Sequence, residues 1–178
     1  RLFDENDLPS AALKLDLLKL GRELFTSAGY LDIGMDHFSK PEDDLSIAWK
    51  EGRLHRNFMG YTTQRTALLL GLGVSSISDS GTAFAQNEKT LHDYYERVGK
   101  GELPVFRGHL LTKEDRSFRR YILDTSCRGK AEFREEDLET LRQYSFPVLK
   151  SLEADELLTW DEKGLEVTEL GRLFIRNI

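Results

Sequence analysis

The stretch at residues 157–168, LLTWDEKGLEVT, decides how the end of the chain folds. Two short apolar runs in it flank Asp161–Gly164, which has the composition of a hairpin turn. Thr168 then stands at the N-cap position of a last helix, TELGRLFIRNI. A hairpin placed between helices is typical of a winged-helix arrangement. We therefore expect a helical C-terminal region with a small β-hairpin wing.

Helical patterns precede this hairpin. Thr112 and Asp115 have the spacing of a capping box at the start of the helix TKEDRSFRRYILDTS. Residues 134–156 are also helical in pattern, apart from a break at Pro147, where the proline ring removes a backbone donor. The region that leads into the wing is therefore predicted to be mainly α.

The earlier part of the chain alternates helical and strand-like patterns. In order, the pattern predicts a helix over residues 9–28, a short strand over 30–33, a helix over 41–52, a buried parallel strand over 66–78 and a helix over 86–104. The run at 66–78, TALLLGLGVSSIS, is apolar and then glycine-rich, which is typical of a parallel strand entering a loop. We expect an α/β domain over residues 1–104 and a mainly α domain over 105–178, with the boundary near Glu102–Phe106.

Composition narrows the class of protein. The chain has 178 residues and a net charge of −6, so nothing general attracts it to nucleic acid or to an anionic membrane. The apolar runs are too short to span a bilayer, and a single cysteine excludes an internal disulfide. We expect a cytoplasmic protein. Because the chain lacks an initial methionine and ends within an apolar pattern, we also expect it to be part of a longer chain.

Two local patterns could carry catalysis, and a structural role is favoured for both. Asp36 and His37 follow a short strand, but a metal site needs three or four ligands, and the other histidines lie in separate segments. We therefore expect no metal site. Cys127 lies on the apolar side of a helix, beside Arg128 and without a neighbouring histidine, so a buried thiol is expected rather than a nucleophile.

Two further patterns could bind phosphate or DNA. The segments GLGVSS and SDSG are glycine- and serine-rich, but neither is followed by the lysine that a phosphate-binding loop requires. The helix after the wing offers only Arg172 and Arg176, whereas DNA affinity depends on clustered basic residues. A wing that docks against another part of the fold is therefore favoured over a DNA reader.

The segment at residues 55–63, HRNFMGYTT, has neither a helical nor a strand period. It crowds basic, amide, aromatic and hydroxyl side chains around Gly60, which suits a loop that packs an aromatic ring on a flat ligand. A surface loop anchored by a buried Phe58 explains the same composition. Both interpretations stay open on the residues alone.

Five blocks resemble a known family. GYLDIGMDHFSKPEDDL, EGRLHRNFMGYTTQ, LLGLGVSSIS, AQNEKTLHDYYERV and DEKGLEVTELGRLFIRNI occur in the order found in the C-terminal half of bacterial oxygen-independent coproporphyrinogen III oxidases, also called coproporphyrinogen dehydrogenases. The resemblance covers residues 8–178. It implies a fold of α/β followed by mainly α, in which the last β/α units of a partial radical-SAM (β/α) barrel precede a helical C-terminal domain.

The resemblance also implies a chemistry. In this family a [4Fe–4S] cluster cleaves S-adenosyl-L-methionine (SAM), and the resulting radical takes a hydrogen from each of two propionates of coproporphyrinogen III. Loss of CO₂ and of one electron from each substrate radical then gives the vinyl groups of protoporphyrinogen IX, in haem biosynthesis. The cluster motif belongs to the first half of the family, and one cysteine cannot supply the three thiolates that the cluster needs. No catalytic residue is therefore expected in this chain, which should be inert alone.

Two cofactor contacts carry over from the family. Phe58 matches a phenylalanine that lies against SAM, and Ile77 matches an apolar residue that contacts the same cofactor. Met59 replaces the family's glutamine, which puts the details beside the ring in doubt. As partners for substrate propionates we expect Arg53 and Arg56, because guanidinium groups suit two-point carboxylate binding, although both could also lie on a solvated face.

Two functions remain open. In the first, the chain belongs to a monomeric radical SAM oxidase that takes a porphyrinogen substrate and receives electrons for its cluster from an electron donor. In the second, it belongs to a non-catalytic haem- or porphyrin-binding relative built on the same framework. A CxxxCxxC motif upstream of Arg1 in the parent protein distinguishes the first from the second.

Overall fold

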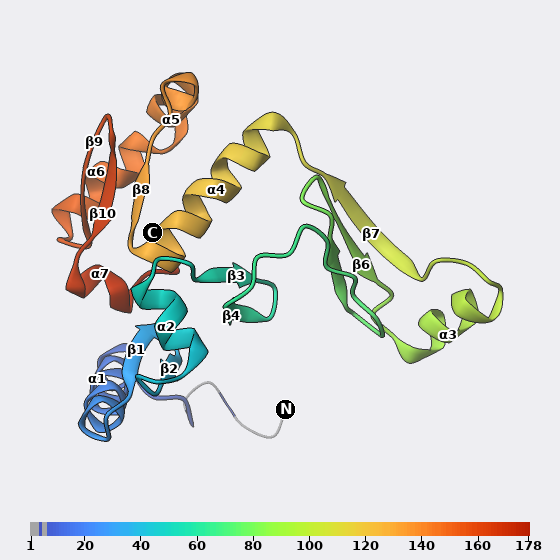
Figure 1. The fold of residues 1–178 in the computed structure, drawn as a ribbon, viewed down its shortest axis with the longest axis horizontal. Helices are drawn as coiled ribbons and strands as arrows, with labels where there is room; N and C mark the ends of the chain where they lie inside the picture. Colours follow the sequence, from blue (N-terminus) through green and yellow to red (C-terminus); the bar gives the residue numbers. More distant parts are fainter. Residues whose placement is uncertain (1–3, 5–6) are drawn as a thin grey trace.

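The computed structural model describes residue 4 and residues 7–178 (Figure 1). The helices are α1 Ala11–Ser27, α2 Asp44–Lys50, α3 Leu91–Gly99, α4 Lys113–Arg128, α5 Leu138–Tyr144, α6 Phe146–Ala154 and α7 Glu169–Leu173, with a 3-10 helix, η2, at Glu135–Asp137. The strands are β1 Leu31–Gly34, β2 His37–Ser39, β3 His55–Asn57, β4 Gly60–Thr62, β5 Ile77–Asp79, β6 Ala83–Asn87, β7 Val105–Leu110, β8 Lys130–Glu132, β9 Leu158–Asp161 and β10 Gly164–Val167. Helix α4 lies between the sheet β5-β6-β7 at one end of the molecule and the wing at the other.

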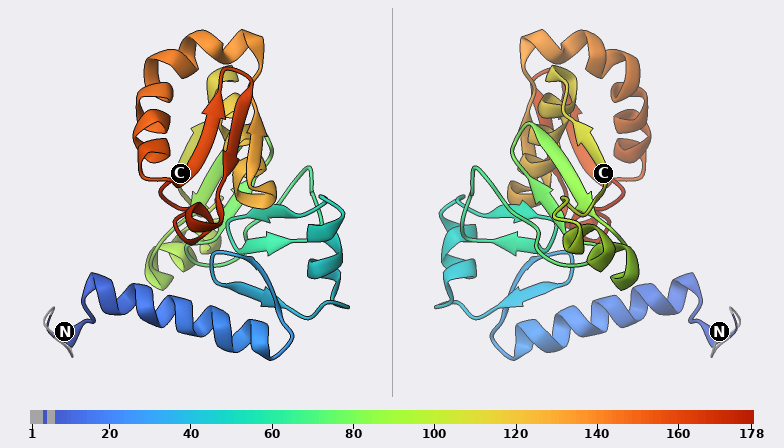
Figure 2. Two further views of the ribbon diagram at one scale, coloured as in Figure 1. Left: turned by 90° about the vertical axis from the view of Figure 1, so that its left-hand side faces the viewer. Right: turned by 90° about the vertical axis from the view of Figure 1, so that its right-hand side faces the viewer.

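The first helix confirms the sequence prediction. Ser10 caps α1 by accepting a hydrogen bond from the Leu13 amide, and the chain leaves the helix through Gly29 at φ +81°. Every residue of α1 is at least partly exposed. The helix extends along one edge of the molecule in both views of Figure 2, and its leucine face is open to solvent.

The strands form four small sheets, and every pair in the described part of the chain is antiparallel. The predicted buried parallel strand over residues 66–78 is therefore wrong. That segment is irregular up to residue 76 apart from a bridge between Leu69 and Asp79, its last two residues begin the antiparallel strand β5, and Leu72 within it is 86% exposed. Side chains hold its backbone instead. The Ser78 hydroxyl accepts a hydrogen bond from the Gly71 backbone N–H, and the Asn87 side-chain amide donates to the carbonyls of Gly71 and Gly73.

The segment HRNFMGYTT is a hairpin rather than an unpatterned loop. Strands β3 and β4 pair from His55 opposite Thr62 to Asn57 opposite Gly60, so Phe58 and Met59 form the turn. The Asn57 side chain accepts a hydrogen bond from the Met59 amide, and Gly60 adopts φ +131°. Three-residue strands are too short to show a period of two, which explains why the sequence pattern did not predict them.

The predicted strand over residues 30–33 is confirmed as β1, but it belongs to a local hairpin. It pairs with β2, and the turn between them holds Met35 at φ 54° beside Asp36. The unit is therefore a helix followed by a hairpin, not half of a βαβ unit.

The wing is confirmed and is larger than predicted. Strands β9 and β10 form the hairpin, and β8 adds a third strand on the other edge of β10. The helix after the wing is shorter than TELGRLFIRNI, because α7 ends at Leu173. Tyr121, Ala131 and Leu141 form a buried cluster against which five phenylalanine or leucine side chains pack.

Helix α4 joins the two parts of the fold. Cys127 near its end is buried with Ile33 and Leu54 of the earlier part, and the Tyr61 hydroxyl donates to the Ser126 carbonyl at 2.7 Å. The predicted fold class, α/β followed by mainly α, is confirmed. The division into residues 1–104 and 105–178 stays a proposal, and β7, which begins the second range, pairs with β6 of the first.

The capping box of α4 allows a first prediction. Thr112 accepts from the Asp115 amide at 3.1 Å, and the Asp115 carboxylate accepts from the Thr112 amide at 2.8 Å, as the sequence predicted. Thr112→Ala should lower the free energy of unfolding by about 1 kcal/mol, measured by urea denaturation, because the first turn of α4 loses its acceptor. Ser151→Ala, at an exposed position inside α6, should change it by less than about 0.5 kcal/mol. Equal effects of the two substitutions would contradict the role of the cap.

Candidate functional site

Phe58 lies at the tip of the β3–β4 hairpin and is directed toward the sheet β5-β6-β7. Its ring meets the ring of Phe84 edge-on, with centroids 5.1 Å apart and an interplanar angle of 82°. Phe58 nevertheless remains 49% exposed. The residue is thus positioned by one aromatic contact and keeps a large part of its ring free, which a buried anchor would not do.

Ile77 belongs to the same face of that sheet as Phe84. In the antiparallel register Ile77 pairs with Gln86 and Asp79 pairs with Phe84, and directly opposed residues project to one side. The backbone of Gly71 packs on Ile77 so closely that a Cβ there would lie 2.8 Å from the Ile77 backbone. Phe58 and Ile77, the two residues predicted to contact a cofactor, therefore border one face of β5-β6-β7.

Arg119 of α4 packs on the same face of the sheet. It forms a two-point ion pair with Asp79, in which its Nη1 lies 3.0 Å from the carboxylate, and its guanidinium lies 5.1 Å from the Phe84 ring centroid. Burial raises the pKa of Asp79, but the hydrogen bonds from Arg119 and from the Gly81 amide outweigh it and hold that pKa below its usual value. Asp79 is therefore charged, and its ion pair with Arg119 connects α4 to β5.

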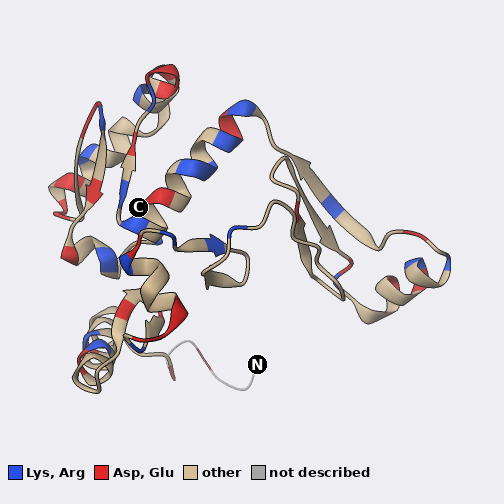
Figure 3. Cartoon of the chain, viewed as in Figure 1, with Lys and Arg blue, Asp and Glu red and all other residues tan. Residues whose placement is uncertain are grey.

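A cavity of about 870 Å³ lies beside this contact, between the α2–β3 connection, the chain after β4 and helix α4. Six arginines line it, and Figure 3 shows the basic residues on α4 and along the β3–β4 region. They are Arg53, Arg65, Arg116, Arg119, Arg120 and Arg128. Asp124 is the one acidic residue in the described lining. We refer to this space as the arginine cavity.

Four of the six guanidinium groups have a carboxylate partner. Arg53 pairs with Glu51, Arg119 with Asp79, Arg120 with Asp137 at 3.6 Å and Arg128 with Asp124 at 3.2 Å. Within residue 4 and residues 7–178, Arg65 and Arg116 form no ion pair. The Arg116 Nε instead donates to the Thr112 carbonyl at 3.3 Å. The cavity therefore has two positive charges without a counter-ion.

The structure separates the two arginines that the sequence analysis paired. Arg53 lines the arginine cavity, whereas Arg56 is absent from its described lining. The Arg56 guanidinium lies 6.0 Å from the ring centroid of Tyr61, and its buried Nε has no hydrogen-bond partner in the described structure. Sequence reasoning also missed Arg65, Arg116 and Arg119. The i, i+3 spacing of the last two on one helix face was the available signal.

His55 also lines the arginine cavity, and its pKa responds to the positive charges there. Its pKa is lowered first by burial and then by the positive charges of Arg65 and Arg119. We predict that Arg65→Gln raises the His55 pKa toward the ordinary value of 6.5, measured by NMR titration of the imidazole. Arg134→Gln, on the far side of α4, should leave it unchanged. If the His55 pKa is the same in Arg65→Gln as in wild type, the Arg65 guanidinium does not lie near His55.

The sign of the stability effect follows from this shift. Because the folded pKa of His55 lies below the unfolded one, its contribution to stability is present above pH 6.5 and is lost as the pH falls below that value.

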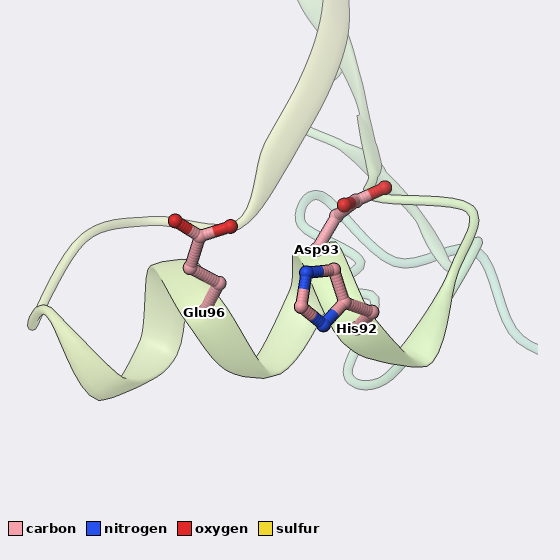
Figure 4. Close-up of side chains that lie close together, drawn as sticks. All are labelled: His92, Asp93 and Glu96. Atoms are coloured by element: carbon pink, nitrogen blue, oxygen red, sulfur yellow. The ribbon is translucent and has the colours of Figure 1, made fainter.

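Among the described residues, no third ligand joins Asp36 and His37 to form a metal site. Their side chains lie 3.0 Å apart at the β1–β2 turn. Instead His92, Asp93 and Glu96 of α3 bring ligand atoms within 4.8 Å of one another (Figure 4), a cluster that the i, i+4 spacing of His92 and Glu96 could have indicated. All three residues are exposed, and the two carboxylates are bonded to Thr90 and to Lys100. These two carboxylates therefore stabilise helix α3 through contacts with its own end residues.

Cys127 is buried, as predicted. Burial raises the pKa of its thiol to about 11, although the nearby charges of Arg56 and Arg128 act in the opposite direction. A thiol of that pKa is protonated at neutral pH, which disfavours a role as a nucleophile.

The SDSG segment closes on itself, because the Asp79 carboxylate accepts from the Gly81 amide at 2.8 Å. The helix after the wing, α7, docks against the earlier part of the chain. Arg172 donates to the Asp32 carbonyl at 3.1 Å and lies over the Trp49 ring. In the part of the chain that the structure describes, no helix is long and apolar enough to cross a bilayer.

No family model matches the chain. Its whole length is 42% identical to the oxygen-independent coproporphyrinogen III oxidase of Escherichia coli, of which it covers 40%. It is 40% identical to the enzyme of the same name from Pseudomonas aeruginosa, also covering 40%, and 42% identical to that of Thermostichus vulcanus, covering 56%.

A solved structure of the Escherichia coli coproporphyrinogen III oxidase, described as a radical SAM enzyme, superimposes with a TM-score of 0.87 at 41% identity. The superposition covers 98% of this chain and 42% of that one. The chain thus spans less than half the length of its relatives from Escherichia coli and Pseudomonas aeruginosa. Along its whole length the chain is therefore similar to the C-terminal half of proteins named oxygen-independent coproporphyrinogen III oxidase.

Proposed function

We propose that the full-length protein carrying this chain oxidatively decarboxylates two propionates of coproporphyrinogen III to vinyl groups, giving protoporphyrinogen IX. The observation that carries the proposal is 42% identity along the whole chain to a protein named for this reaction, together with a TM-score of 0.87 to a radical SAM enzyme of that name. Because the chain covers 40% of that relative, the proposal concerns the parent protein. The chain alone is inert.

The cofactor part of the proposal rests on Phe58 and Ile77. A half-exposed aromatic ring offers a flat surface, and the close approach of Gly71 to Ile77 leaves backbone atoms at the same sheet face. These groups fit the adenosyl part of SAM, with Phe58 against the flat base and Ile77 along its edge. Bound SAM supplies a carbon radical that takes hydrogen atoms from the substrate.

The cluster part of the proposal lies outside this chain. A [4Fe–4S] cluster on three cysteines does not fit the residues present, because the single cysteine is buried with a raised pKa. The residues that ligate the cluster therefore belong to another part of the parent.

Arg53 and Arg56 are the proposed partners for substrate propionates. The position of Arg53 on the arginine cavity supports its role. Arg56 has a buried Nε without a partner, which a carboxylate could satisfy from the Tyr61 side of β3.

The remaining features of the parent are proposed with the reaction. An electron donor reduces the cluster, and the enzyme is a cytoplasmic monomer. Residues 1–104 complete the barrel of the parent, and residues 105–178 form its helical domain with the wing.

The test is anaerobic turnover by the full-length protein after cluster reconstitution, with coproporphyrinogen III, SAM and a strong reductant. The expected products are protoporphyrinogen IX, CO₂ and 5′-deoxyadenosine, measured by chromatography and mass spectrometry. If the protein binds haem or porphyrin tightly and forms no 5′-deoxyadenosine, the oxidase proposal is wrong and a non-catalytic porphyrin-binding function replaces it.

A further inference from the structure

The arginine cavity contains more positive charge than the surrounding fold neutralises. Its six guanidinium groups face four carboxylate partners, which leaves Arg65 and Arg116 unpaired among the described residues. In addition, the Nε of Arg120 is buried without a hydrogen-bond partner in the described structure, whereas its Nη2 lies 3.6 Å from the Asp137 carboxylate. Arg65 and Arg116 are exposed, so their guanidinium groups are free to form two-point hydrogen bonds with an anion that enters the cavity.

The cations come from opposite walls of the cavity. Arg65 belongs to the chain after β4, and Arg116 belongs to the first turns of α4, one turn before Arg119 and Arg120. Apolar side chains lie between these walls, namely Leu54, Ala67 and Leu123. The lining therefore suits a ligand with an apolar body and negatively charged arms. A volume of about 870 Å³ is within the range for small-molecule sites.

The cavity is continuous with the proposed cofactor wall. Arg119 lines the cavity, and its guanidinium also covers Phe84, which in turn contacts Phe58. Phe58 itself lies outside the described lining, so Arg119 and Phe84 connect the cavity to the proposed cofactor wall. An arm of a ligand in the cavity that reaches past Arg119 would approach a cofactor at Phe58.

We propose that the arginine cavity binds the carboxylate arms of a porphyrin-type polycarboxylate, with Arg65 and Arg116 as the two cations that recognise them. The identity of the ligand rests on the proposed function, whereas the binding of a polycarboxylate rests on the charge and shape of the cavity. His55 in the same wall adds an imidazole, which can donate a hydrogen bond to a carboxylate.

Binding of coproporphyrin III, the stable and fluorescent oxidised form, tests the inference. Its Kd for the full-length protein is measured by fluorescence titration for wild type, Arg65→Gln, Arg116→Gln and the double variant. Each single substitution should raise the Kd about fivefold and the double substitution about twentyfold, because each removes a charged hydrogen-bond donor. Both side chains are exposed, so the variants should unfold at the same temperature as wild type.

Three controls separate carboxylate recognition from other effects. Arg134→Gln removes an exposed arginine outside the cavity and should leave the Kd unchanged. Arg65→Lys and Arg116→Lys should retain part of the affinity that the glutamine variants lose, because lysine keeps the charge but not the two-point geometry. A porphyrin without carboxylate arms should bind all variants equally.

The outcomes distinguish this inference from the proposed reaction. If wild type binds coproporphyrin III and the double variant binds it equally well, the cavity does not recognise carboxylates, even where turnover is normal. The inference also fails if wild type does not bind at all. If the variants lose affinity but wild type forms no 5′-deoxyadenosine, the cavity assignment stands and the proposed oxidase function fails.

Discussion

Phe58→Ala in the full-length protein is expected to lower kcat/KM for coproporphyrinogen III about a hundredfold. Stacking of a base on an aromatic ring contributes about 1–3 kcal/mol, and the upper part of this range corresponds to a hundredfold change. Phe58 keeps 49% of its surface exposed and touches only the edge of Phe84, so its loss removes a ligand surface more than a core contact. Initial rates of protoporphyrinogen formation and the Kd for SAM, measured by equilibrium dialysis, report the effect.

Met59→Ala is the matched control for Phe58→Ala. It lies in the same turn and is 89% exposed, so its truncation should change kcat/KM less than twofold. Phe58→Tyr should retain most of the activity because it keeps the ring. If Phe58→Ala binds SAM as tightly as wild type, the hairpin tip is a packed surface turn and not a cofactor wall.

Gly171→Ala is expected to cause the largest loss of stability, at least about 3 kcal/mol. A Cβ at Gly171 would lie 1.8 Å from the carbonyl oxygen of Leu157, which is backbone and cannot rotate away. The Gly171 amide also donates to Thr168, which caps α7. The insertion must push α7 away from the wing, and overpacking of this kind costs 1–3 kcal/mol or more. Thermal unfolding followed by circular dichroism should show a midpoint about 10 °C lower.

Gly21→Ala is the opposite case in the same chain. Gly21 lies inside α1, and a Cβ there meets nothing within 4 Å, so alanine should stabilise the helix by up to about 1 kcal/mol. If Gly171→Ala unfolds at the same temperature as wild type, α7 does not pack against Leu157 as described.

The local parts of the fold were predictable from the sequence. Thr112 and Asp115 indicated the start of α4, Thr168 indicated the start of α7, and the Asp161–Gly164 turn indicated the wing. Each of these signals depends on residues within four positions of one another. The apolar run at 66–78 misled the prediction, because its glycines approach Ile77 and its amides bond to side chains instead of a neighbouring strand.

The candidate site was only partly predictable. The residues around Phe58 indicated either a ligand wall or a buried anchor, and the exposed fraction of its ring, 49%, favours the wall. Arg53 was identified and lies on the cavity, but Arg65 and Arg116 were not considered. These two are 51 positions apart in the printed sequence, so no local spacing connects them.

By itself the sequence determined the helix caps, the wing, the buried state of Cys127 and the family resemblance, because these follow from short-range hydrogen bonds, local periodicity and motifs read in order. Only the tertiary structure decided that Phe58 meets Phe84, that Arg119 joins Asp79 and that unpaired arginines share one cavity. These contacts join residues that are 26 or more positions apart, and α4 brings most of them together. Such convergence depends on how whole elements pack and not on the propensities of their residues.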